Sequence, residues 1–168
     1  MTAKIKKLFR DNIITKAGMQ PVEEIFAEKK LIGIYFSGQW CPPCRIFTSC
    51  LIEFYNDAKH IDENLLEIVF LSLDRSKAEF EDYYSLMPWC ALRHGDPIIS
   101  KLGSKFGTQG IPHLVILDPS GNIIDQNARG SVSNSKGNVL ELIQQWNDAI
   151  PVNTSTVNDS SNSDCVVT

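Results

Sequence analysis

Two cysteines separated by two prolines follow directly on an apolar run, and this junction constrains the fold more than any other feature of the chain. Residues 31–36 (LIGIYF) are predicted to form a buried strand, and apolar side chains in residues 42–59 recur at helical spacing. A Cys-x-x-Cys motif between a strand and a helix is the arrangement used for thiol–disulfide exchange. We therefore expect Cys41 and Cys44 to form a reactive dithiol.

The order of the motif predicts a separate role for each cysteine. Cys41 lies at or just before the first helical turn, where the helix dipole favours the thiolate that attacks a disulfide. Pro42 and Pro43 suit the first helical positions, whose N–H groups have no acceptor within the helix, and they stiffen the loop. Cys44 is expected to resolve the mixed disulfide. Trp40 is expected to shield the sulfur and to offer a contact face.

A metal site is the alternative interpretation of the motif. A zinc site built on Cys-x-x-Cys usually needs a second pair of ligands. Cys50 and Cys90 are isolated in the sequence, and His94 and His113 lack the spacing of ligands. We therefore expect no bound metal, with Cys50 packed away from the dithiol and Cys90 as a small buried side chain.

The remaining pattern predicts strands that alternate with helices. The alternation over residues 8–15 favours a short hairpin or an edge strand, and Pro21 suits the first turn of a helix through Glu28. We expect further strands at 65–73, 114–117 and 123–124, the last antiparallel, and helices near 77–86, 97–106 and 136–148. This order indicates an α/β fold with a central mixed sheet and helices on both faces.

The chain is predicted to consist of one domain, residues 1–150, and a tail. Residues 151–168 are mostly Asn, Ser, Thr, Asp and Val without periodicity, so we expect a disordered polar segment. The last four residues, from Cys165, fit the prenylation pattern, but a terminal Thr is not among its favoured last residues.

Charge and hydropathy limit the partners and the location. The net charge is −4 and there is no long basic run, so nucleic acid is not an expected partner. The first residues lack the apolar stretch of a signal peptide, and no run approaches the ~18 apolar residues of a membrane span. We expect a cytosolic protein, with the nucleus as a second compartment. Thiols are kept reduced there, which favours a catalytic dithiol over a structural disulfide.

A second motif, Gly110-Ile111-Pro112, precedes the predicted strand 114–117. A proline at this position is a candidate for a cis peptide bond. It could face Cys41 in space, with the Ile111 backbone free to pair with an extended substrate. The alternative, an ordinary proline at the start of a strand, stays open on local sequence alone.

These residues together resemble the thioredoxin superfamily, in its tryparedoxin and nucleoredoxin-like branch. The similarity covers about residues 8–150 and is carried by residues 35–45 (YFSGQWCPPCR), 47–48 (FT), 51–55 (LIEFY), 69–74 (VFLSLD), 87–89 (MPW) and 111–115 (IPHLV). The resemblance implies a thioredoxin fold with an N-terminal extension. It also implies a cis Pro112 beside the dithiol, Trp40 and Trp89 lining the approach to it, and Arg129 near the substrate groove.

The resemblance also implies a function. It points to a thiol–disulfide oxidoreductase that reduces protein disulfides without a bound cofactor, with electrons from an external thiol or reductase. Glutathione and thioredoxin reductase are the candidate donors, and disulfide-containing proteins are the expected partners. A redox-sensitive binding module of the nucleoredoxin type is the second possibility.

Two departures from related sequences bear on the mechanism. Thioredoxins carry a buried aspartate six residues before the first cysteine, where this chain has Tyr35, as tryparedoxins do. The base for Cys44 is therefore open between Asp74 and water. Tryparedoxins that use the polycationic thiol trypanothione tend to have acidic residues after the Asp74 position, where this chain has Arg75, Ser76 and Lys77. Cations there would repel such a thiol.

Overall fold

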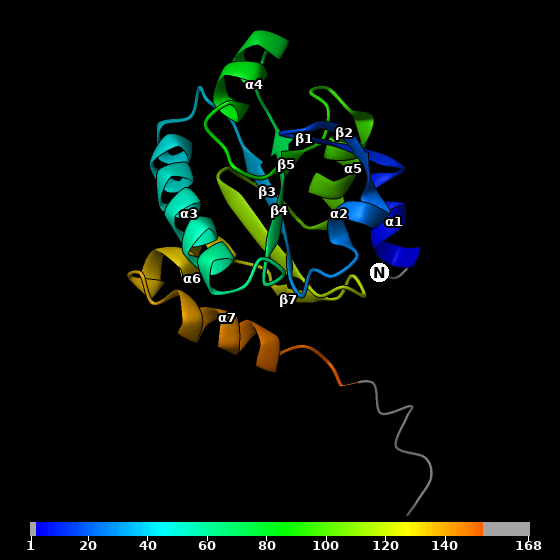
Figure 1. Ribbon diagram of the computed structural model, residues 1–168. Coiled ribbons are helices and arrows are strands. Elements are labelled where there is room, and N and C mark those ends of the chain that lie inside the picture. Colours follow the sequence, from blue (N-terminus) through cyan, green and yellow to red (C-terminus); the bar gives the residue numbers. More distant parts are fainter. Residues whose placement is uncertain (1–2, 153–168) are drawn as a thin grey trace, which may run out of the picture.

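A mixed seven-stranded sheet forms the centre of the fold, in the order β2-β1-β5-β4-β3-β6-β7 (Figure 1). The computed structural model describes residues 3–152. β3, β4 and β5 run parallel to one another, and β6 pairs antiparallel with β3. The strands span Asn12–Thr15 (β1), Gly18–Pro21 (β2), Ile32–Ser37 (β3), Glu67–Ser72 (β4), Cys90–Ala91 (β5), His113–Leu117 (β6) and Ile123–Asp125 (β7).

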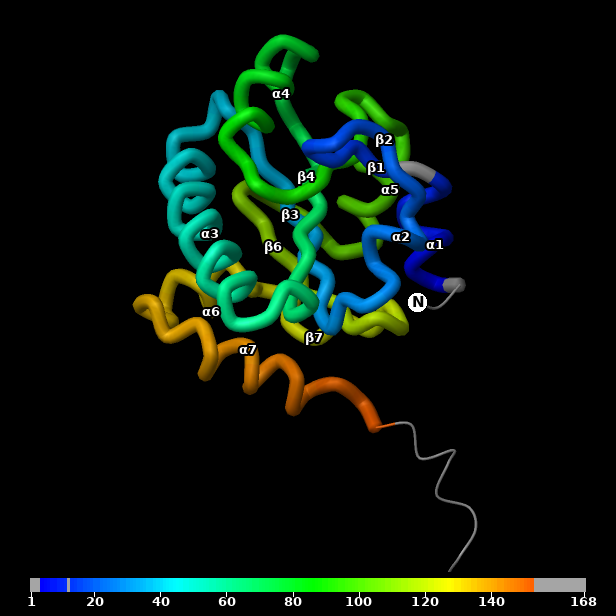
Figure 2. The backbone as a smooth tube through the Cα atoms, viewed as in Figure 1, coloured from blue at the N-terminus to red at the C-terminus, as the bar shows by residue number. Residues whose placement is uncertain are grey.

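Helices cover both faces of this sheet, as the sequence predicts. One face packs against α3, α4, α6 and α7, and the other against α1, α2 and α5 (Figures 1 and 2). Their bounds are Ala3–Phe9 (α1), Val22–Phe26 (α2), Pro42–Ile61 (α3), Lys77–Tyr84 (α4), Pro97–Lys105 (α5), Ala128–Ser135 (α6) and Val139–Asp148 (α7). Two hydrophobic cores result, one on each side of the sheet.

The central strands are apolar on both sides because both sides are covered. In β3, Ile34 and Phe36 point into one core while Tyr35 between them points into the other. Phe70 and Leu71 of β4 divide in the same way. Successive side chains of a strand point to opposite faces, so a strand buried on both faces reads as a continuous apolar run. This pattern fixes β3 in the middle of the sheet, with its C-terminal end leading into the Cys-x-x-Cys motif.

The N-terminal extension differs in part from the prediction. A hairpin is present, but it comprises β1 and β2, and residues 3–9 before it form α1. Ile5 and Phe9 lie one helical turn apart and are both buried, so the helical period explains their burial. Arg10, with a φ of 62°, separates the helix from the hairpin. α2 starts after Pro21 as expected but ends at Phe26, two residues before Glu28.

The C-terminal part contains two helices where the sequence predicts one. Lys136 and Gly137 have φ values of 49° and 83°, which are incompatible with a helix that starts at residue 136. α7 therefore begins at Val139. The preceding helix, α6, escapes prediction because its sequence, ARGSVSNS, is polar and buries only Ala128 and Val132.

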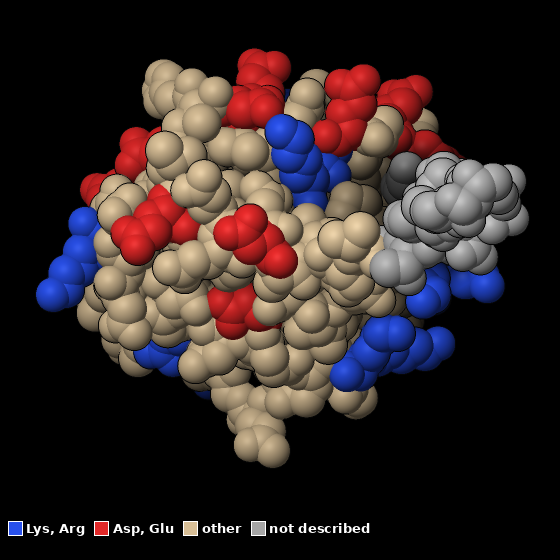
Figure 3. Space-filling model, turned by 90° about the horizontal axis from the view of Figure 1, so that it is seen from below, with Lys and Arg blue, Asp and Glu red and all other residues tan. Residues whose placement is uncertain are grey.

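The predicted tail lies almost entirely outside the described residues, from 153 onward, so its disorder and the modification of Cys165 stay predictions. Within residues 3–152, none of the helices has the length and apolar composition needed to cross a bilayer. Figure 3 shows the end of the molecule opposite to the motif, where acidic and basic side chains are both present among uncharged ones.

Candidate active site

The two cysteines of the motif lie at the N-terminal end of α3. Cys41 is the residue before the first helical turn, and Pro42 and Pro43 occupy that turn, as predicted. Cys41 is 7% exposed, whereas Cys44 is fully buried. The backbone therefore presents Cys41 toward the surface and keeps Cys44 one turn behind it, which suits an attacking thiol and a resolving thiol respectively.

A cis peptide bond joins Ile111 to Pro112, which confirms the expectation from the resemblance. β6 begins immediately afterwards, and its His113 pairs with Phe36 near the end of β3. This antiparallel register brings the Ile111-Pro112 segment next to the motif, although the two are far apart in sequence. The Cys41 Sγ lies 3.9 Å from the carbonyl oxygen of Ile111.

Trp40 lies beside Cys41 with 41% of its surface exposed. Its indole N–H donates a hydrogen bond of 2.9 Å to the carbonyl oxygen of Leu73, and the Arg75 guanidinium sits 4.7 Å from the centre of its ring. A Cβ atom at Gly38 would come within 2.6 Å of the indole nitrogen, so the glycine permits this close approach. The indole is thus held as an exposed surface next to the dithiol.

Asp74 fixes the loop ahead of the motif. One carboxylate oxygen accepts a hydrogen bond of 2.6 Å from the backbone N–H of Gln39, and the other accepts one of 2.6 Å from the Ser72 hydroxyl. Both oxygens are therefore occupied in holding this loop. This arrangement gives Asp74 a positioning role and favours the view that another group serves Cys44.

The Cys44 thiol lies near hydroxyl groups, since it interacts with the side chains of Ser37, Tyr35 and Tyr83. The pKa of the Cys44 thiol is raised to about 11, mainly by burial and secondly by the hydrogen bond with Cys41. Hydrogen bonds from the Gly38 backbone and the Ser37 side chain act to lower this pKa. The Tyr35 hydroxyl, six residues before Cys41, lies 2.7 Å from Thr48 Oγ1. Burial raises the pKa of Tyr35 far above its ordinary value, so this residue cannot replace an aspartate as a base.

Three polar residues of this cluster, Ser37, Thr48 and Tyr83, are not among the site residues predicted from the sequence. Thr48 could have been found, because it follows Cys44 by one helical turn and so shares its helix face. Tyr83 comes from α4, and only the packing of α4 against the sheet brings its hydroxyl close to Ser37, at 2.8 Å.

The raised pKa of Cys44 predicts slow alkylation of this thiol. Only the thiolate reacts, so Cys44 in the reduced protein should be modified very slowly by iodoacetamide at pH 8, with a rate that rises as the pH approaches about 11. Cys50, which is exposed on the same helix, should react sooner. Peptide mass spectrometry measures both rates in one sample. Equal rates in the folded protein would contradict the prediction, and unfolding in guanidinium should abolish the difference.

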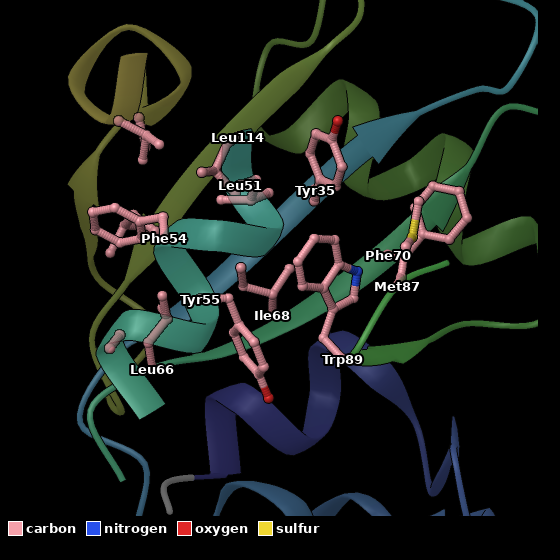
Figure 4. Packing of buried hydrophobic residues seen from close by; sticks show 14 of the residues in the cluster. Tyr35, Leu51, Phe54, Tyr55, Leu66, Ile68, Phe70, Met87, Trp89 and Leu114 are labelled. Carbon is pink, nitrogen blue, oxygen red and sulfur yellow. The ribbon is translucent and has the colours of Figure 1, made fainter. Parts of the chain in front are cut away.

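Trp89 does not line the approach to Cys41, so this expectation is wrong. The residue precedes β5 at the end of the sheet opposite to the motif, and only 2% of its surface is exposed. Its indole packs edge-on against the rings of Tyr35 and Tyr55, at 6.1 and 5.5 Å between centres (Figure 4). The position of Trp89 next to a proline in the sequence therefore does not distinguish a tryptophan of the core from one that lines a groove.

Two further candidate residues, Arg129 and His113, come from α6 and β6. Arg129 is exposed on the first turn of α6, and its role near the groove stays a prediction. His113 is engaged through both ring nitrogens, with Thr108 Oγ1 at 2.8 Å and the Gln126 carbonyl oxygen at 3.0 Å. Its imidazole therefore ties β6 to the segment after β7.

The other two cysteines among the described residues lie apart from the dithiol. Cys50 is exposed, and the buried Cys90 donates a hydrogen bond of 3.1 Å to the Ile68 carbonyl oxygen. Among the described residues, His, Cys, Asp and Glu side chains form no group of three that could hold a metal ion.

Comparison with known proteins places these features in a family. Residues 29–123 match a family model described as thioredoxin-like. Human nucleoredoxin is 42% identical over 118 residues, which are 70% of this chain and 27% of the relative. Tryparedoxin from Trypanosoma brucei brucei is 39% identical over 123 residues, which are 72% of this chain and 83% of the relative. The chain thus spans about a quarter of the length of the nucleoredoxins that it matches and most of the length of the tryparedoxin.

Solved structures agree with the sequence comparisons. Tryparedoxin II from C. fasciculata has a TM-score of 0.72 and 38% identity, and the match covers 79% of this chain and 88% of that one. Thioredoxin from Wuchereria bancrofti has a TM-score of 0.69 and 36% identity, with 76% and 88% covered. The relatives and the geometry of Cys41 and Cys44 support thiol–disulfide oxidoreductase chemistry. The chain belongs to the thioredoxin-like family, in the group that includes the tryparedoxins and nucleoredoxins.

Proposed function

We propose that this protein is a protein-disulfide reductase. The observation that carries the proposal is the placement of Cys41 at the N-terminus of α3, beside the Ile111 carbonyl group, with Cys44 buried one turn behind it. An extended substrate can pair with the Ile111 backbone and bring its disulfide next to the Cys41 sulfur. The exposed indole of Trp40 offers a contact surface on the same side.

The reaction proceeds in two exchanges. The Cys41 thiolate attacks one sulfur of the substrate disulfide, forms a mixed disulfide and releases the first substrate thiol. Cys44 then attacks the Cys41 sulfur, so the Cys41–Cys44 disulfide forms, the mixed disulfide breaks, and the second substrate sulfur leaves and takes up a proton. The substrate gains two electrons and the protein loses two, which an external thiol or reductase restores.

We further propose that the electron donor is not a polycation. Tryparedoxin II is known in complex with glutathionylspermidine, a thiol that carries a polyamine. Here the positive charge of Arg75 lies 4.7 Å from the Trp40 ring and so flanks the dithiol, and Lys77 follows in α4. A cationic thiol would be repelled at this rim. Glutathione or thioredoxin reductase is the donor that we propose, in the cytosol and also in the nucleus.

Reduction of insulin with dithiothreitol as the electron donor tests the proposed activity. The wild-type protein should accelerate the reaction well above dithiothreitol alone, and Cys50→Ser, which removes an exposed thiol outside the motif, should match the wild type. Replacing dithiothreitol by glutathione or by thioredoxin reductase with NADPH then identifies the donor. Absence of any acceleration by folded wild-type protein would contradict a general reductase activity.

A binding role is the second candidate, favoured by the similarity to nucleoredoxins and by the exposed indole beside the dithiol. In this case the surface around Trp40 would hold a partner protein, and oxidation of Cys41 and Cys44 would release it. Capture of proteins by the reduced but not the oxidised form, lost in Trp40→Ala, would support this role. Capture that ignores both the redox state and the substitution would exclude it.

A further inference from the structure

Four buried hydroxyl groups form a continuous chain beside Cys44, and Ser37, at one end of this chain, is the member whose side chain interacts with the Cys44 thiol. Ser37 Oγ lies 2.8 Å from the Tyr83 hydroxyl, which lies 2.5 Å from Thr48 Oγ1, which in turn lies 2.7 Å from the Tyr35 hydroxyl. All four side chains are at most 3% exposed. The residues come from β3, α3 and α4, so the packing of three elements is needed to assemble the chain.

The hydrogen atoms of this chain can all be oriented toward Cys44. Each hydroxyl has one hydrogen to donate. If Tyr35 donates to Thr48, Thr48 to Tyr83 and Tyr83 to Ser37, the Ser37 hydrogen is left for the Cys44 sulfur, with which the Ser37 side chain interacts. Hydrogen bonds arranged head to tail polarise and strengthen one another in a buried environment.

Resting on the reductase function proposed above, we infer that this chain of Ser37, Tyr83, Thr48 and Tyr35 is a neutral hydrogen-bond donor that stabilises the Cys44 sulfur as it becomes negative during resolution of the mixed disulfide. Ser37 is the member whose side chain interacts with the Cys44 thiol, and the other three are positioning residues. The chain takes the place of a charged base, since Asp74 is engaged with the loop before the motif.

The proton balance follows from this role. During resolution, the bond between Cys44 sulfur and its hydrogen breaks, the Cys41–Cys44 bond forms, and the bond from Cys41 to the substrate sulfur breaks. The proton passes through solvent to the departing substrate thiolate, so the hydroxyl groups keep their own hydrogens. Burial opposes the negative charge on Cys44 and raises its pKa, and the hydrogen bond from Ser37 offsets part of that effect.

Stopped-flow reaction with the aromatic disulfide DTNB separates the two steps in one trace. The first thionitrobenzoate is released as Cys41 attacks, at a rate that depends on reagent concentration, and the second as Cys44 resolves, at a rate that does not. All proteins carry Cys50→Ser and Cys165→Ser, and the remaining thiol outside the motif, Cys90, is buried, so that thiols outside the motif do not contribute. Absence of a concentration-independent second phase in this parent protein would contradict the dithiol mechanism itself.

Substitutions in the chain of hydroxyl groups should slow only the second phase of the DTNB reaction. For Ser37→Ala we expect a decrease of about tenfold or more at pH 7, in the range of a lost hydrogen bond to a charged group. Tyr83→Phe and Thr48→Val should slow it by about threefold, in the range of a neutral hydrogen bond. In each of these three variants, the pH profile of the second-phase rate should move to higher pH. Thr48→Ser keeps a hydroxyl group, so it should show the rate and the pH profile of the parent protein.

Tyr84→Phe is the matched control, because Tyr84 follows Tyr83 directly in α4 but does not belong to the chain of hydroxyl groups. Its hydroxyl donates a hydrogen bond to the Trp89 carbonyl oxygen. Both of its phases should equal those of the parent. A second phase that is unchanged in Ser37→Ala and Tyr83→Phe at every pH would overturn the inference. Equal slowing of both phases without a displaced pH profile would also overturn it, because this result indicates a structural role only.

Discussion

A Cys41→Ser variant should reduce insulin no faster than dithiothreitol alone. Serine preserves the shape of the side chain at the N-terminus of α3, but its hydroxyl does not ionise at neutral pH and does not attack a disulfide. Because Cys44 is fully buried, it cannot reach an external disulfide in place of Cys41. The expected effect is therefore loss of turnover rather than a partial decrease. The turbidity of precipitating insulin B chain measures the rate.

Cys44→Ser is the matched variant for this experiment. It keeps the attacking thiol and removes the resolving one, so it should form a mixed disulfide with substrate and then stop. A single substrate-linked band on a non-reducing gel, present in Cys44→Ser and absent in Cys41→Ser, would assign the roles in the proposed order. Turnover retained by Cys41→Ser, or trapping by that variant, would reverse or exclude this assignment.

Trp89→Ala should lower the free energy of unfolding by about 3–5 kcal/mol, the range for removal of a large buried aromatic side chain. The indole is 2% exposed and contacts Tyr35 and Tyr55 edge to face, so its removal leaves a cavity and deletes two aromatic pairs (Figure 4). Denaturation in urea, followed by circular dichroism, measures the change.

Two controls distinguish this structural role from a role in the groove. Trp89→Phe retains an aromatic ring and removes an indole N–H that has no hydrogen-bond partner among the described residues, so it should cost much less than Trp89→Ala. Trp40→Ala removes a partly exposed ring with one hydrogen bond to Leu73, so it should lower the unfolding free energy much less than Trp89→Ala does while raising the KM for insulin. A stable Trp89→Ala protein with weakened substrate binding would instead support the original expectation.

The central fold and the dithiol could be predicted because both depend on local sequence. The apolar run that forms β3, the motif after it and the helical period of α3 occupy one continuous segment, residues 32–61. The burial of β3 on both faces is visible as an uninterrupted apolar run. Prolines at the first helical positions identified the start of α3 without any tertiary information.

What could not be predicted depends on contacts between distant segments. Trp89 looks like a groove residue when it is judged by its neighbours in the sequence, but the parallel pairing of β5 with β4 places it at the far end of the sheet. Tyr83 joins the cluster around Cys44 only because α4 packs over the sheet next to α3. β5 itself has two residues, which is too short to produce a periodic signal.

The hairpin of the N-terminal extension has a consequence for solubility at high protein concentration. β1 pairs with β5 at Ile14 and Ala91. It therefore covers the edge of β5, which would otherwise offer unpaired N–H and C=O groups to a neighbouring molecule. The strand that then forms the border, β2, has only four residues and ends in Pro21, which has no N–H to donate. On the other side, β7 has three residues and an irregular register with β6. Both edge strands are therefore poor templates for the addition of a strand from another molecule, so extended intermolecular sheets are disfavoured.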